Sequence, residues 1–83
     1  MNRYYLEFIL NANDISDQML RDALMEFSEG LEIHQILSGN ADQGQYFKIN
    51  MYTQDPKIIF DICLQFGRIK SVKVEEEPRS SIL

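Results

Sequence analysis

The sequence has 83 residues, of which 45% are hydrophobic and 25% are charged, so a disordered or low-complexity chain is disfavoured. A chain of this length supports one small domain, and a second subunit is a natural source of additional burial. The 13 acidic and 8 basic residues give a net charge of −5, which argues against direct binding to nucleic acid or to an anionic membrane.

A single cysteine, Cys63, excludes an internal disulfide and a zinc site built from four cysteines. The first ten residues are too charged for a signal peptide, and no segment approaches the roughly 18 apolar residues of a membrane span. We therefore expect a cytoplasmic protein.

The predicted elements begin with a strand and an amphipathic helix. Residues 4–10 are rich in aromatic and β-branched side chains, which favour a strand. Ser16 is a candidate N-cap, and apolar residues then recur at helical spacing until Gly30, which we expect to end the helix.

The rest of the chain predicts a hairpin, a second helix and a last strand. Residues 31–38 and 45–53 each suit a strand, and the segment 38–45 between them is rich in turn-forming residues. After the hairpin, Asp55 can cap a helix that has proline at its first position and a glycine, Gly67, where helices commonly end. The last strand is expected over residues 68–75.

The element order β-α-β-β-α-β predicts an α+β protein, a ferredoxin-like sandwich in which two helices cover one face of a four-stranded antiparallel sheet. Right-handed crossovers then place the first and third strands in the centre of the sheet. We expect a single domain over residues 1–76 and a flexible C-terminal tail over residues 77–83.

Alternation along the strands separates a helix-facing side from an open face. The residues expected in the core are Tyr4, Leu6, Phe8, Leu10, Phe47, Ile49, Met51, Val72 and Val74. The open face is expected to be more apolar than a solvated face needs to be, which is typical of an interface. The residues expected to form a protein interface on it are Tyr5, Ile9, His34, Ile36, Tyr46, Lys48 and Tyr52.

The segment 14–32 carries the whole charge imbalance, with six acidic residues against one arginine. Three of them, Asp22, Glu26 and Glu29, are spaced to share one stripe of the first predicted helix. Such an acidic helix stripe is either the solvated back of the helix or a surface that binds a basic protein, for example one that itself binds nucleic acid.

The sequence contains no pattern that indicates a catalytic, cofactor-binding or metal-binding site. His34 is the sole histidine, and Cys63 falls on the apolar stripe of the second predicted helix, so a catalytic nucleophile and a metal site both lack partners. The glycines of segment 38–45 have neither phosphate-binding nor dinucleotide-binding spacing. We expect a protein that is not an enzyme and uses no cofactor.

The element order resembles that of ACT-type regulatory domains, which typically pair to bind small effectors between subunits. Their usual glycine-bearing turn after the first strand is not evident in residues 11–15. RNA-recognition motifs also carry aromatic residues on an open sheet, but the third predicted strand, residues 45–53, lacks their basic, glycine-containing pattern.

The leading hypothesis is a small interaction or regulatory module that forms a homodimer through its open sheet face or a strand edge. One alternative is an acidic inhibitor or adaptor that binds a basic protein through the first helix. Another is an ACT-like sensor of a small molecule.

Overall fold

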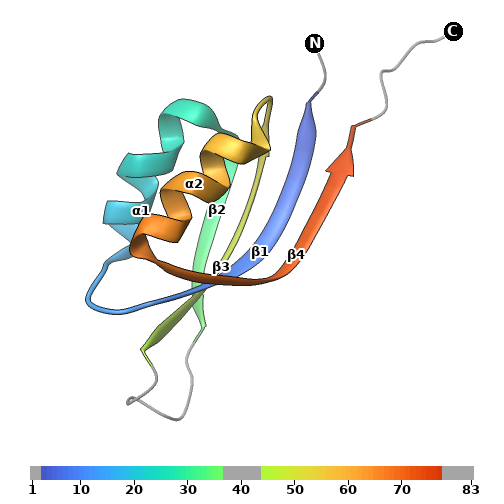
Figure 1. The fold of residues 1–83 in the computed structure, drawn as a ribbon. Helices are drawn as coiled ribbons and strands as arrows, with labels where there is room; N and C mark the ends of the chain where they lie inside the picture. The colour runs from blue at the N-terminus through green and yellow to red at the C-terminus, as the bar shows by residue number, and fades with distance from the viewer. Residues whose placement is uncertain (1–2, 37–43, 78–83) are drawn as a thin grey trace, which may run out of the picture.

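A computed structural model describes residues 3–36 and 44–77. These residues form a four-stranded antiparallel sheet and two α-helices, an α+β arrangement (Figure 1). The elements in chain order are β1 (Tyr4–Ala12), α1 (Asp17–Leu24), the 3₁₀ turn η1 (Met25–Phe27), β2 (Glu29–Ile36), β3 (Gln45–Thr53), α2 (Pro56–Phe66) and β4 (Gly67–Glu76). Most of the predicted turn segment 38–45 and the predicted tail from residue 78 onward lie outside the described residues.

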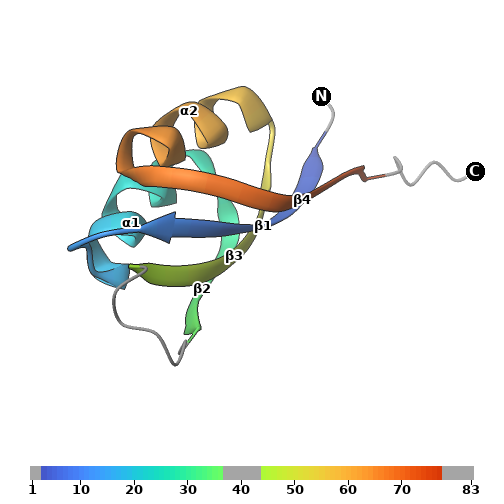
Figure 2. The ribbon, with the colours of Figure 1, turned by 60° about the horizontal axis from the view of Figure 1, so that its bottom comes forward.

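The strand order in the sheet is β2-β3-β1-β4. The first and third strands are therefore central, as the sequence predicts, and Figure 2 shows β1 between β3 and β4. Each neighbouring pair is antiparallel. β2 and β4 are consequently the two edges of the sheet.

The core lies between the helices and the side of the sheet that β1 and β3 turn toward them. The predicted core residues of these two strands are confirmed, because each is fully buried: Leu6, Phe8, Leu10, Phe47, Ile49 and Met51. The helices add further buried residues, Leu20, Leu24, Ile59 and Cys63, and the predicted Tyr4 packs against the cluster while half-buried. Phe8 meets the ring of Phe60 edge-on, with 5.4 Å between ring centroids.

The prediction that Val72 and Val74 belong to the core is wrong, since their exposed fractions are 50% and 47%. A β-bulge explains part of the difference, because the register between β1 and β4 shifts and both Ser71 and Val72 lie against Phe8. Ser71 has a left-handed backbone, with φ of 56°. Val74 lies opposite Leu6, so its side chain is on the side of the sheet that faces the helices. No described side chain covers it fully.

The first helix ends earlier than predicted, at Leu24 rather than before Gly30. The hydroxyl of Ser28 donates a hydrogen bond of 2.8 Å to the carbonyl of Leu24, and that of Thr53 donates one of 2.7 Å to the carbonyl of Phe27. These hydroxyls satisfy carbonyl groups that a longer helix would have paired internally. The chain therefore leaves the helix and enters β2, in which Gly30 has a φ of 62°.

The second helix begins and ends as predicted. The carboxylate of Asp55 accepts hydrogen bonds from the backbone N–H groups of Lys57 and Ile58, at 3.1 and 3.4 Å, which caps the helix N-terminus. Pro56 takes the first turn, where its missing N–H costs nothing. The helix ends at Phe66, and β4 starts immediately at Gly67.

Candidate interaction surface

The face of the sheet turned away from the helices is the first candidate for function. The strand register places the seven residues of the predicted interface on it: Tyr5, Ile9, His34, Ile36, Tyr46, Lys48 and Tyr52. The three tyrosines and Ile9 are half-buried, whereas the other members are exposed.

The open face is divided into two aromatic groups. The rings of Tyr5 and Tyr52 lie opposite each other at one end, with centroids 5.2 Å apart. Tyr46 lies toward the other end, with the ammonium group of Lys70 4.7 Å from its ring centroid. Between the two groups, Lys48 and Glu7 form an ion pair of 3.2 Å. The face is therefore not one continuous apolar patch.

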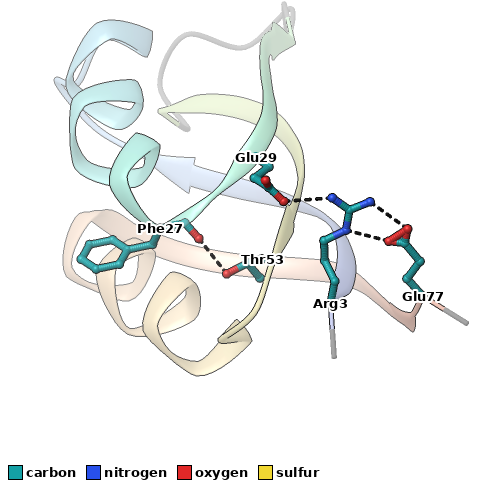
Figure 3. A network of polar contacts seen from close by, with 5 residues as sticks. All are labelled: Arg3, Phe27, Glu29, Thr53 and Glu77. Carbon is teal, nitrogen blue, oxygen red and sulfur yellow. Dashed lines mark hydrogen bonds and ion pairs between the residues drawn. The ribbon is translucent and has the colours of Figure 1, made fainter. Parts of the chain in front are cut away.

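The guanidinium group of Arg3 joins three strands at one end of the sheet (Figure 3). It donates two hydrogen bonds to the carboxylate of Glu77, at 2.6 and 2.8 Å, and one of 2.9 Å to Glu29. It also stacks over Tyr52, 4.5 Å from the ring centroid. The first of the two aromatic groups is thus already covered on one side by a cation.

Glu77, the first residue of the predicted tail, is bound to Arg3 through both its backbone and its side chain. The backbone N–H of Glu77 donates a hydrogen bond of 2.8 Å to the carbonyl of Arg3, in addition to the side-chain pair. Residue 77 is therefore held against Arg3 at the end of the sheet. No local pattern indicates this contact, because residues 3 and 77 are 74 positions apart and are brought together by the sheet.

We expect Glu77→Gln to lower the stability of the protein at pH 7, with a smaller loss at pH 3. The two hydrogen bonds from Arg3 lower the pKa of Glu77. A carboxylate whose folded pKa lies below its unfolded pKa stabilises the fold above the unfolded value, and this contribution is lost as the pH falls through the folded value. Urea unfolding at both pH values measures the difference, with Glu26→Gln as a control that removes an exposed carboxylate. An equal loss at both pH values would contradict the role given to the pair.

A shallow hollow of about 640 Å³ lies beside the Tyr5 and Tyr52 rings. Three carboxylates, those of Glu75, Glu76 and Glu77, also line it. The accumulation of negative charge disfavours an anionic ligand such as a nucleotide at this place.

The predicted acidic helix stripe is wrong, because its three residues lie in three different elements. Asp22 is in α1, where it accepts a hydrogen bond of 2.9 Å from Gln18, and Glu26 is in η1. Glu29 is the first residue of β2 and is bound to Arg3. The stripe required a helix that continued to Gly30, and the helix ends before it.

The chemical groups that the sequence singled out occupy ordinary positions. Cys63 is buried in the core, and burial raises the pKa of its thiol to about 12, so it stays protonated near neutral pH. Within residues 3–36 and 44–77, no three histidine, cysteine or acidic side chains are grouped so that they could hold a metal ion. Neither helix in this part of the chain is long and apolar enough to span a membrane.

Comparison with protein-family models, with curated proteins and with solved structures finds no match for this chain. A functional proposal therefore depends on the positions and exposure of the residues in the sheet.

Proposed function

We propose that this chain is a small, non-catalytic interaction module of ferredoxin-like architecture that forms a homodimer through its open sheet face or an edge of its sheet. The observation that carries the proposal is the exposure of Val72 and Val74, about half each, on an edge strand. An unpaired edge that carries apolar side chains is a site at which another strand can add.

The small size of the domain also favours association. Apolar burial and ordering entropy nearly cancel in a chain of this length, so a second subunit adds stability that one core cannot provide. The single buried cysteine suits a reducing, cytoplasmic setting.

The two alternative functions have less support. An adaptor that binds a basic protein through an acidic helix loses its surface, because Glu29 belongs to β2 and is held by Arg3. An ACT-like sensor would need a site that encloses a small ligand. The hollow beside Tyr5 is open to solvent and is lined by three carboxylates, so it is a poor candidate for such a site.

We expect the wild-type chain to have a solution mass near twice 9.7 kDa at high concentration and a lower mass on dilution. Size exclusion coupled to light scattering, over a tenfold range of concentration, measures this mass. A mass that stays at 9.7 kDa over the whole range would contradict the homodimer.

The double variant Tyr46→Ala/Tyr52→Ala then separates the two possible surfaces. A fall in mass assigns the contact to the open face, and an unchanged mass assigns it to a sheet edge. The matched control is Met19→Ala/Met25→Ala, which shortens two exposed side chains of α1 and η1 instead. Circular dichroism of each variant checks that the fold is retained.

A further inference from the structure

We propose that two copies of this chain pair antiparallel through β4, with Val74 of one copy opposite Val74 of the second copy. This inference rests on the homodimer proposed above and specifies its surface and register. β4 is the outermost strand beside β1, and no described strand lies along its other side (Figure 1). We call this outer side of residues 72–76 the β4 edge.

The backbone groups at the centre of the β4 edge point outward. The N–H of Glu77 donates to the carbonyl of Arg3, so residue 77 directs its backbone groups toward β1. The register between β1 and β4 is continuous from Glu76 back to Lys73, and backbone groups alternate in direction along an antiparallel strand. Lys73 and Glu75 therefore also face β1, and the N–H and C=O groups of Val74 and Glu76 face away from it.

Val74 lies within the uninterrupted part of the edge, residues 73–76. The bulge at Ser71 and Val72 disrupts the ladder on one side, and β4 ends at Glu76 on the other. Two identical antiparallel strands can be related by a two-fold axis. The side chains of opposite residues then lie on the same face only if one residue, the centre of the pairing, lies opposite its own copy. Centring on Val74 pairs residues 73–75 of the two copies, all outside the bulge, and lets the outward N–H and C=O groups of the two Val74 residues bond each other.

Charge selects Val74 as the centre of the pairing. Centring on Lys73 would place two lysines opposite each other, and centring on Glu75 would do so with two glutamates, both of which are unfavourable. With Val74 at the centre, Lys73 of each copy lies opposite Glu75 of the other. These two residues share the open face, where their side chains are 3.9 Å apart within one chain, and the second copy would extend this pair to four alternating charges.

The opposite side of the paired strands would hold the exposed valines. Val74 shares the helix side of the sheet with Leu6, so the two copies of Val74 would pack on each other there. The other edge strand, β2, offers a poorer match, since its register shifts between Glu29 and Glu32 and both carboxylates already have partners in Arg3 and Asn50.

Charge reversal across the contact tests the register directly. In Lys73→Glu all four charges at the contact are negative, and in Glu75→Lys all four are positive. We expect each variant alone to have a dimer dissociation constant at least about tenfold higher than wild type. An equimolar mixture of the two variants is expected to form a heterodimer of near wild-type affinity, because every opposite pair is then complementary. Light scattering and analytical ultracentrifugation of the variants and of their mixture measure this.

The matched control uses the exposed ion pair of α2, in which Lys57 and Asp61 are 2.7 Å apart. Lys57→Glu and Asp61→Lys change the charge by the same amounts away from the β4 edge, and their mixture is expected to associate no better than either variant. A wild-type dimer that both β4 reversals leave unchanged, or a mixture that fails to recover association, would overturn the register while leaving the homodimer intact. A wild-type monomer would overturn both proposals.

A backbone variant provides a second, independent test. Val74→Pro removes an N–H that points away from β1, so the pairing of β1 with β4 keeps its hydrogen bonds. We expect this variant to remain folded by circular dichroism and to become monomeric, and Val74→Thr to remain dimeric. A folded proline variant that dimerises as wild type would rule out the β4 edge.

Discussion

Replacing Phe8 with alanine is expected to lower the free energy of unfolding by about 3–5 kcal/mol. The ring of Phe8 is fully buried in the core and meets Phe60 edge-on. A rigid sheet on one side and α2 on the other leave little freedom to fill the cavity that truncation would create. A chain of 83 residues has a total stability of about 4–12 kcal/mol, so the loss would be a large fraction of it.

Urea unfolding followed by circular dichroism measures this loss. The control is Phe27→Ala, because Phe27 is 39% exposed and its truncation is expected to cost less than about 1 kcal/mol. Equal losses for the two variants would contradict a central place for Phe8 in the core.

Replacing Gly67 with alanine is expected to destabilise the protein by about 3 kcal/mol or more. A β-carbon at this position would overlap the carbonyl oxygen of Asn11 and come within 3.0 Å of the Cα of Ala12. Both atoms belong to the backbone of the central strand, which cannot move without disturbing its other neighbours. The variant would therefore push the start of β4 away from β1 at the point where α2 ends.

Gly30→Ala is the matched comparison for Gly67. Gly30 has a φ of 62°, but the nearest atom to an added β-carbon is 4.0 Å away, on Tyr52. This substitution is expected to cost about 1 kcal/mol through backbone strain alone. Thermal or urea unfolding of both variants tests the difference, and a smaller loss for Gly67→Ala than for Gly30→Ala would contradict the steric explanation.

The sequence was sufficient to predict the elements whose signals are local. The alternation in residues 4–10 and 45–53 correctly identified the buried side of β1 and β3, since both strands are central and one side of each is fully covered. Asp55 and Pro56 correctly marked the start of α2. Gly67 was correctly placed at the end of that helix, but its reason is close approach to β1, because its backbone is extended and not left-handed.

The features that sequence analysis missed depend on contacts between distant residues. The end of α1 is fixed in part by Thr53, which lies in β3 and binds the carbonyl of Phe27. The exposure of Val72 depends on a bulge that is visible only when β4 is paired with β1. The same is true of the contact between Arg3 and Glu77, which joins residues 74 positions apart. No spacing rule within one segment could have indicated these three features.

The position of β1 in the sheet has a consequence for how the chain folds. β1 precedes both of its partners, and those partners, β3 and β4, are separated from it by dozens of residues. Its pairing therefore requires the closure of long loops, which slows folding relative to proteins built from local contacts. During synthesis, the apolar side of β1 emerges well before α2, which covers it, so the segment around Phe8 is exposed to aggregation or to a chaperone until α2 has left the ribosome.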